Sequence, residues 1–380
     1  MTKNASGVKS KIWLSAPHIS GHEEVYIKEA FKTNWIAPLG PNVDGFESDL
    51  EGYLENESHV TALTSGTAAI HLALKLLNVS AGDEVLCQTK TFVASVNPVI
   101  YVGATPIFID SETKTWNLCP ELLEKAILDR LQKGKKPKAI IAINLYGMPY
   151  NVTDIHAIAR KYQIPVIEDS AEALGSHYKN QPCGTFGDLS ILSFNGNKII
   201  TTSGGGALVS RNRDTKKRAI FLATQAKDPG INYTHSEVGY NYRLSNILAG
   251  IGRGQMQVLE NRIQTRRAHY EYYKNELQHI SDIEFLEEPE NYFSNRWLTA
   301  ILFKTKTIRD GVLQALSKEN IESRPSWKPM HQQPMFENHP SYLNGVSDNL
   351  FERGLCLPSG SNLTDVELDR VNLVIKKYFG

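Results

Sequence analysis

Short apolar runs and amphipathic stretches alternate along the first part of the chain, between about residues 58 and 210. The β-type runs are HVTALTS, DEVLCQT, TPIFID, KAIIAINLYG, PVIEDS, LSILSF and GALVS. The stretches between them keep helical spacing, as in AAIHLALKLLNV, CPELLEKAILDRLQ and VTDIHAIARKY. This alternation predicts an α/β fold with a mainly parallel sheet covered by helices on both faces. Such sheets bind ligands at the carboxyl ends of their strands.

The pattern changes after about residue 243. The stretch RLSNILAGIGRGQMQVLENRIQTRRAHYEYYKNELQHI keeps helical spacing over many turns, which predicts a long helix or a helix pair. The run NRWLTAILFKT and the helical stretches RDGVLQALSKEN and DVELDRVNLVIKKYF then predict a smaller α+β domain. We therefore expect a large domain over residues 1–255 and a small domain over residues 256–380.

Composition narrows the classes of partner. The 380 residues carry 41 basic and 41 acidic side chains, so a nucleic-acid or anionic-membrane partner is not expected. The four cysteines show no CxxC spacing, and we expect them to be reduced, with no metal site. The start of the sequence has no apolar signal region, and no apolar run approaches about 18 residues, so we expect a cytoplasmic protein without a membrane span.

The first candidate site motif is TSGTAAIHLAL, where a strand ends in Ser65-Gly66-Thr67 and a helix begins at once. Unpaired N–H groups and the positive end of the helix dipole favour a phosphate there. The alternative is an ordinary helix N-cap, for which serine and threonine are also preferred. The motif alone leaves both interpretations open.

The second motif is PVIEDSAEALGS, where Asp169 follows an apolar strand. A buried carboxylate is costly unless it meets a cation, and the protonated nitrogen of a pyridine ring is one such partner. The alternative is an N-cap for a following helix, with Glu172 as the capping-box partner. This motif too is undecided by itself.

The third motif is SFNGNKIITTSGGG, which places Lys198 between a strand and a glycine run. A poorly solvated lysine can become a neutral amine that forms imines with aldehydes, whereas the commoner alternative is a surface lysine in a turn. The order of the three motifs favours a functional site over the three structural alternatives. A phosphate-type turn, a strand-end aspartate and a lysine on one sheet are the contacts that pyridoxal 5′-phosphate (PLP) needs.

The chain resembles the DegT/StrS family of nucleotide-sugar aminotransferases, which have the aspartate-aminotransferase fold (fold type I). The resemblance covers nearly the whole chain, through the segments NWIAPLGPNVDGFE, TSGTAAIHLAL, TFVASVNPV, VIEDSAEALGS, FGDLSILSFNGNKIITTSGGGALV and GYNYRLSNILAGIGRGQM. It implies a large PLP-binding domain, a smaller C-terminal domain, and a homodimer whose active site is shared between subunits.

The resemblance also implies roles for individual residues. Lys198 is the catalytic lysine that links to the cofactor, Asp169 pairs with the ring nitrogen, and Glu172 contacts the phenolic oxygen, where the family commonly has glutamine. The other residues implied to bind the cofactor are Ser65, Gly66, Thr67 and Ser193 at the phosphate, Phe92 on the ring face and Asn241 from the neighbouring subunit.

The implied reaction moves an amino group, expected from glutamate, to C4 of a nucleotide-linked 4-keto-6-deoxy sugar. The segments near Trp35, Lys328 and His331 look closest to members that aminate UDP-2-acetamido-2,6-dideoxy-hex-4-ulose on the route to bacillosamine-type sugars, and these three residues are candidates to bind the sugar nucleotide. Each has a plain alternative, as core for Trp35 and as loop surface for the other two. The alternatives for function are a perosamine-forming GDP-sugar aminotransferase and a non-catalytic regulator that senses a ligand.

Overall fold

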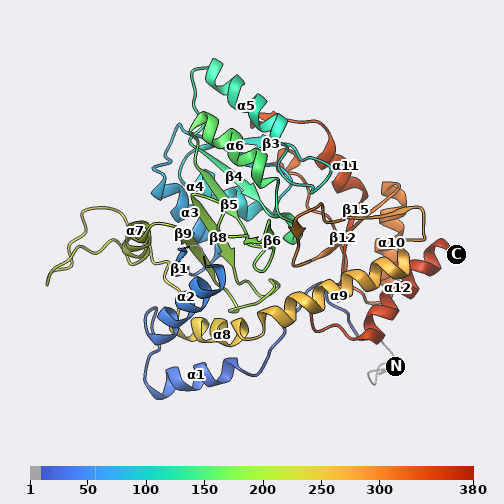
Figure 1. Ribbon diagram of the computed structural model, residues 1–380, viewed down its shortest axis with the longest axis horizontal. Helices are drawn as coiled ribbons and strands as arrows, with labels where there is room; N and C mark the ends of the chain where they lie inside the picture. The colour runs from blue at the N-terminus through green and yellow to red at the C-terminus, as the bar shows by residue number, and fades with distance from the viewer. Residues whose placement is uncertain (1–9, 56) are drawn as a thin grey trace.

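A large, mostly parallel sheet forms the centre of the molecule (Figure 1). The computed structural model describes residues 10–55 and 57–380. The eight strands of the sheet pair in the order β1-β9-β8-β5-β4-β2-β3-β14, and every pair is parallel except the two that involve β9. The strands, in sheet order, are β1 (His59–Leu63), β9 (Gly206–Ser210), β8 (Leu189–Ser193), β5 (Val166–Asp169), β4 (Ala139–Ile143), β2 (Glu84–Gln88), β3 (Thr105–Ile109) and β14 (Ser341–Tyr342).

Helices cover both faces of this sheet. Successive residues of a strand point to opposite faces, so an apolar strand needs a cover on each side. Val85 and Cys87 of β2 pack into a core with α3 (Gly66–Leu76) and α7 (Arg213–Ala223), whereas Leu86 between them packs with α5 (Pro120–Gln132) and α6 (Val152–Tyr162). The helices of this part are α1 (Glu23–Lys32), α2 (Pro41–Leu54), α3 (Gly66–Leu76), α4 (Asn97–Tyr101), α5 (Pro120–Gln132), α6 (Val152–Tyr162), α7 (Arg213–Ala223) and α8 (Asn246–Met256), with short 3-10 turns at Val93–Ser95 and Leu145–Gly147. Among the described residues, no helix combines the length and the apolar character needed to cross a membrane.

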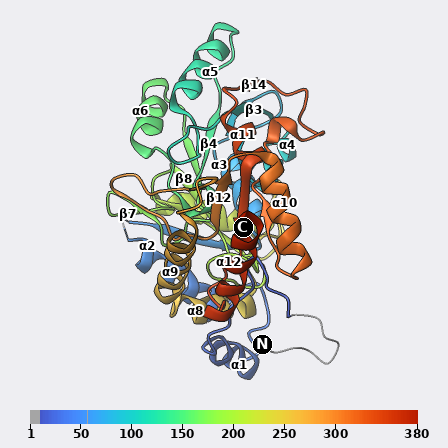
Figure 2. The same ribbon diagram turned by 90° about the vertical axis from the view of Figure 1, so that its right-hand side faces the viewer.

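The predicted helix pair is observed, and it leads to a second layer of structure. Helix α8 is followed by α9 (Leu259–Leu277), which runs under the smaller sheet in Figure 1. That sheet is antiparallel, and its strands in order are β10 (Ile283–Phe285), β12 (Thr299–Phe303), β15 (Gly354–Leu357) and β13 (Arg324–Pro325). Figure 2 shows α12 and α10 side by side over this part. Its helices are α10 (Lys306–Lys318), α11 (Val346–Arg353) and α12 (Asp365–Phe379), with a 3-10 turn at Met330–Gln332.

The two parts of the chain exchange segments, which the sequence pattern does not indicate. Strand β14 lies beyond residue 256 yet pairs with β3 of the large sheet. In the other direction, Ile12 packs in the core of the smaller layer and bridges to Ile321. A small third sheet pairs β11 (Tyr292–Phe293) with β6 (His177–Tyr178), which also pairs with β7 (Gln181–Pro182). The division after residue 255 falls in the last turn of α8 and stays a prediction.

Candidate active site

A cavity of about 280 Å³ opens at the carboxyl edge of the large sheet. It is lined by strand ends and by loops that come from distant parts of the sequence. Eight of the residues singled out from the sequence line it, namely Ser65, Gly66, Thr67, Phe92, Asp169, Glu172, Ser193 and Lys198. The parallel strands explain this convergence, since their carboxyl ends meet at one edge of the sheet.

The start of α3 forms one side of the cavity. Ser65 is extended, and its hydroxyl accepts a hydrogen bond from Ala68 N at 3.0 Å, so Ser65 is an N-cap, as its alternative interpretation held. The first N–H groups of a helix have no partner within the helix, and Gly66 and Thr67 at this helix start line the cavity. Strands β8 and β9 pack closely on this turn: a Cβ at Gly206 would lie 2.3 Å from Ser65 C, and one at Gly66 3.2 Å from Ser193 Cβ.

Asp169 ends β5 and is buried. One carboxylate oxygen accepts from Ser95 Oγ at 2.7 Å and the other from Ala171 N at 3.1 Å. Burial raises the pKa of Asp169, and these two hydrogen bonds together with Lys198 oppose that rise. Turns follow Asp169 instead of a helix, so the capping interpretation of this aspartate is wrong. The site thus holds a buried carboxylate that would be stabilised by a cationic ligand.

Lys198 and Glu172 face each other in the cavity. Lys198 Nζ lies 3.6 Å from Glu172 Oε1 and 4.1 Å from the centroid of a Trp297 ring, and only 12% of its side chain is exposed. The other oxygen of Glu172 accepts from Tyr146 N at 2.7 Å, which excludes the capping-box interpretation of this residue as well. Burial raises the pKa of Glu172, while the charge of Lys198 lowers it. The surface-turn alternative for Lys198 is wrong.

The turn that carries Lys198 is fixed from the smaller layer. The carbonyl of Asn197 accepts from Trp297 Nε1 and from Ser15 Oγ, both at 2.7 Å. The buried side chain of Arg266 in turn donates to Ser15 Oγ at 3.0 Å and to the carbonyl of Trp297. Two hydrogen bonds on one carbonyl restrict the residue next to Lys198, so the amine enters the cavity from a rigid turn.

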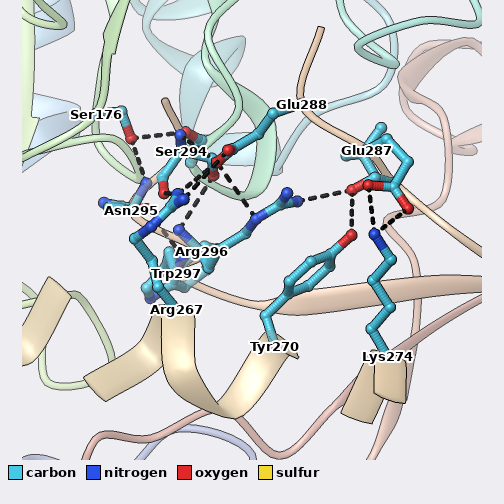
Figure 3. Close-up of polar contacts among 12 residues, drawn as sticks. Ser176, Arg267, Tyr270, Lys274, Glu287, Glu288, Ser294, Asn295, Arg296 and Trp297 are labelled. Atoms are coloured by element: carbon cyan, nitrogen blue, oxygen red, sulfur yellow. Dashed lines mark hydrogen bonds and ion pairs between the residues drawn. The ribbon is translucent and has the colours of Figure 1, made fainter. Parts of the chain in front are cut away.

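Figure 3 shows the segment that brings Trp297 to the site. Asn295 donates from its backbone to Ser176 Oγ at 2.9 Å, and its side-chain amide donates to the carbonyls of Glu172 at 3.0 Å and Leu174 at 2.9 Å. Its Oδ1 accepts from Trp297 N at 2.9 Å. One short segment of the smaller layer therefore holds both the Glu172 backbone and the turn that carries the lysine.

The same segment is tied to α9, as Figure 3 also shows. Arg267 donates to the carbonyl of Ser294 at 2.6 Å and pairs with Glu288 at 2.5 Å. Arg296 lies with its guanidinium 3.7 Å from the ring centroid of Tyr270. Helix α9 thus holds the active-site segment in place through Arg267 and Tyr270.

Four of the predicted site residues do not line the cavity of this single chain. Trp35 is 39% exposed, and Asn241 and Lys328 are exposed. His331 is engaged on both ring nitrogens, with Nδ1 2.8 Å from Thr89 Oγ1 and Nε2 3.0 Å from Asp348 Oδ1. The roles of these four residues in binding stay predictions.

Several cavity residues carried no signal in the sequence. Ser95, Trp297 and Trp327 line the cavity, yet hydrophobic periodicity treats them as ordinary members of a helix, a strand and a loop. Their positions depend on contacts across more than 70 residues of chain, as in the hydrogen bond of Ser95 to Asp169. Local pattern alone has no information about such contacts.

Comparison with known proteins decides the family. The model of the DegT/DnrJ/EryC1/StrS aminotransferase family matches residues 17–376. The chain belongs to this family. EpsN of Bacillus subtilis (strain 168), a proposed pyridoxal phosphate-dependent aminotransferase, is 50% identical over 373 residues, which cover 97% of this chain and 96% of EpsN. The GDP-perosamine synthase of Escherichia coli O157:H7 is 35% identical over 370 residues, 96% of this chain and 97% of that protein.

The fold is also that of the family. The crystal structure of a DegT DnrJ EryC1 StrS aminotransferase from Brucella abortus has a TM-score of 0.88 and 29% identity, covering 94% of this chain and 95% of that one. The fold class expected from the sequence is therefore confirmed. Members of the family depend on PLP, so the expected cofactor is confirmed as well. The protein is an aminotransferase, and activity on sugars is supported.

Proposed function

We propose that the protein is a PLP-dependent 4-aminotransferase of nucleotide sugars. It moves an amino group from glutamate to C4 of UDP-2-acetamido-2,6-dideoxy-hex-4-ulose, a reaction of bacillosamine-type pathways. The observation that carries this proposal is the joint presence, in one cavity, of a helix start, the buried Asp169 and the amine of Lys198.

The residues of the cavity fit the cofactor. Asp169 is a buried carboxylate whose protein partners are a hydroxyl and an N–H group, and it suits the protonated ring nitrogen. The start of α3 with Ser65, Gly66 and Thr67 suits a phosphate. Phe92 is 51% exposed although it is aromatic, and it offers its ring to the cavity. A flat aromatic ligand with one phosphate would satisfy all three features.

The chain's own residues then supply binding and proton transfer. PLP, when bound, provides an aldehyde that takes up amino groups and a ring that withdraws electrons. Lys198 would hold the cofactor through its amine, and as a free amine it would move a proton as the general acid–base group. Asp169 would keep the ring nitrogen protonated, and Glu172, with Oε1 3.6 Å from Lys198 Nζ, would orient the amine.

The purified protein tests this assignment. With added PLP it should show the visible absorption of a lysine-bound cofactor and turn over a 4-keto sugar with glutamate. Lys198→Ala should lose the lysine-bound absorption and lower turnover by about 10²–10⁴-fold. Lys136→Ala, which changes an exposed lysine, is the matched control. A wild-type protein without cofactor absorption would contradict the proposal, and bound cofactor without turnover of any sugar would favour the ligand-sensing regulator.

The nucleotide is the second part of the proposal. The likeness to GDP-perosamine synthases over nearly the whole chain favours GDP-4-keto-6-deoxymannose as the second candidate substrate. Parallel assays with the UDP-linked and the GDP-linked 4-keto sugar, at equal concentration, separate the two. A higher kcat/KM for the GDP sugar would overturn the choice of UDP.

We also propose that the enzyme is a cytoplasmic homodimer with shared active sites. Asn241 is exposed and lies outside the cavity of its own chain, which leaves it available to a second copy. The loop after α7, which projects from the body in Figure 1, exposes Ile231, Tyr233 and Val238 by 98%, 83% and 80%. Exposed apolar side chains of this kind mark an interface. The cysteines are buried and unpaired, as suits a reducing compartment.

Mixing two inactive variants tests the shared site. Random pairing of Lys198→Ala with Asn241→Asp chains should restore about a quarter of wild-type activity, since half of the dimers are mixed and each has one intact site. No recovery would contradict sharing, because each chain would then carry its own defect. Light scattering of the wild-type protein provides the dimer mass.

A further inference from the structure

A buried lysine with no role in the proposed reaction lies beside the cavity. Lys90 follows β2, and none of its side-chain surface is exposed. Its Nζ lies 2.8 Å from Ser326 Oγ and 2.7 Å from the carbonyl oxygen of Trp327. Within the described part of the chain, it forms no ion pair with a carboxylate. A buried ammonium group is costly unless its hydrogen bonds replace those to water.

Both backbone polar groups of Trp327 are bound by side chains that follow strands of the large sheet. Its carbonyl accepts from Lys90, and its N–H donates to the hydroxyl of Tyr146 at 2.8 Å. The Trp327 ring lies 5.5 Å from the Phe92 ring and 5.8 Å from the Tyr146 ring, between centroids, and it lines the cavity. The position of this indole is therefore set from the large sheet, although Trp327 belongs to the C-terminal part.

The neighbours of Trp327 dock on the same loop. Thr89 accepts at its carbonyl from Met330 N at 2.8 Å, and its hydroxyl lies 2.8 Å from His331 Nδ1. The hydroxyl of Ser326, which accepts from Lys90, donates onward to the carbonyl of Leu350 at 2.7 Å. The buried amine of Lys90 thus joins the end of β2 directly to Ser326 and Trp327, while Thr89 holds the residues that follow.

The surroundings of Lys90 are compatible with either protonation state. Burial lowers the pKa of its amine to about 7, Arg309 lowers it further, and Cys356, Asp348 and Asp110 oppose this. A neutral amine still has two N–H groups, one for each acceptor. The contacts to Ser326 and Trp327 therefore persist whether or not the amine is charged.

We propose that Lys90 is a positioning residue for the sugar-nucleotide site, because it holds the indole of Trp327 as the wall of the cavity beside Phe92. The inference rests on the function proposed above. A sugar nucleotide is much larger than glutamate and needs more of the cavity wall. Loss of the wall should therefore weaken sugar binding and leave the reaction with glutamate intact.

The test compares Lys90→Met, which keeps an unbranched apolar side chain as far as the ε position and removes the amine, with Lys136→Met as an exposed control. We expect Lys90→Met to raise KM for the UDP-linked 4-keto sugar by about tenfold while kcat changes less than about twofold. The rate at which glutamate converts the bound cofactor should match wild type. In the Trp327→Phe background, Lys90→Met should raise the KM for the sugar little further, because Lys90 acts through Trp327.

A readout without cofactor separates positioning from general damage. In the cofactor-free protein, Lys90→Met should alter tryptophan emission, and the alteration should vanish in the Trp327→Phe background. If Lys90→Met does not fold, Ser326→Ala removes one of the two acceptors and should give a smaller rise in the same KM. Normal cofactor binding and glutamate conversion, with sugar KM unchanged in Lys90→Met or in this second variant, would overturn the inference and leave the proposed function standing.

Discussion

Asp169 shows how a single residue can be built for a ligand at a cost to the protein. Its carboxylate is buried at the end of β5, and its hydrogen bonds come from Ser95 and Ala171. Burial raises its pKa, so the ionised form is disfavoured when the protein is alone. A cationic ring nitrogen would remove this penalty, which makes the residue more favourable in the loaded enzyme.

Asp169→Asn should therefore stabilise the cofactor-free protein and destabilise the PLP-bound protein relative to wild type. The amide keeps the shape: its oxygen can accept from Ala171 N, and its NH2 can donate to Ser95 Oγ, so that this hydrogen bond reverses its direction. The cofactor-free protein should therefore gain about 1 kcal/mol of stability. The gain in melting temperature on adding PLP should shrink, and turnover should fall at least about 100-fold. Thermal melts with and without PLP measure both effects. An equal gain from PLP in variant and wild type would contradict a pairing of Asp169 with the ring.

His269 on α9 is a second residue whose ionisation is opposed by its position. Burial lowers its pKa to about 4, and the nearby Arg266 lowers it further. Its Nδ1 is buried without a partner among the described residues. The folded protein therefore resists a proton that the unfolded chain, with an ordinary histidine pKa of about 6.5, takes up.

This predicts a specific acid sensitivity. Stability should fall as the pH drops from about 6.5 to about 4, since the unfolded state binds more protons in that window. In His269→Leu this contribution is absent, so its melting temperature should rise relative to wild type as the pH is lowered. Paired melts across the range give the difference, in which other titrating groups cancel. A constant difference would show that His269 is not the source.

At the scale of elements, the start of α3 depends on glycine in a neighbouring strand. Gly206 opens β9, and a Cβ there would lie 2.3 Å from Ser65 C and 2.4 Å from Gly66 N. These are backbone atoms, so a side chain could be accommodated only by moving the helix start. The glycine run therefore has two roles. It forms the turn before β9, and it lets β9 pack closely against the proposed phosphate site.

Gly206→Ala should displace that turn. We expect a loss of about 1–3 kcal/mol of stability from overpacking, and a loss of PLP affinity. Gly52→Ala in α2 is the matched control, because a Cβ there meets nothing within 4 Å and should change stability by no more than about 1 kcal/mol. Thermal melts measure the change in stability, and titration with PLP measures the change in affinity. Wild-type affinity in Gly206→Ala would show that the helix start does not hold the phosphate.

At the scale of the whole molecule, the two layers share a core. One buried cluster joins Trp116, Leu145 and Tyr146 from the large part with Leu286, Trp297 and Leu350 from the rest. The exchanged segments, Ile12 in one direction and β14 in the other, add to this coupling. The layers are thus expected to depend on each other for stability.

Residues 1–255 expressed alone should therefore fail to form a stable, monodisperse protein. Removal of the C-terminal part exposes the apolar side chains of the shared cluster and leaves the edge of β3 unpaired. Size-exclusion chromatography and thermal melts by circular dichroism would show aggregation or a broad transition. A sharp transition near that of the full chain would contradict this coupling and support an independently folding domain over these residues.

The sequence by itself determined the elements and the chemistry of the site. Periodicity predicted helices such as Asp365–Phe379 because helix formation and the burial of one face are local properties of the chain. The order of Thr67, Asp169 and Lys198 was enough to predict a PLP site, because the ends of parallel strands converge. Eight of the predicted residues indeed line one cavity.

Only the tertiary structure decided what surrounds that site. The antiparallel direction of β9, the two-residue strand β14, the rejection of the capping alternatives for Asp169 and Glu172 and the burial of Lys90 all depend on contacts between residues far apart in sequence. Trp297 and Trp327 reach the cavity from the C-terminal part for the same reason. Such contacts follow from how the layers pack. The pattern of side chains along the chain shows which face of an element is buried, but it does not show which other element covers that face.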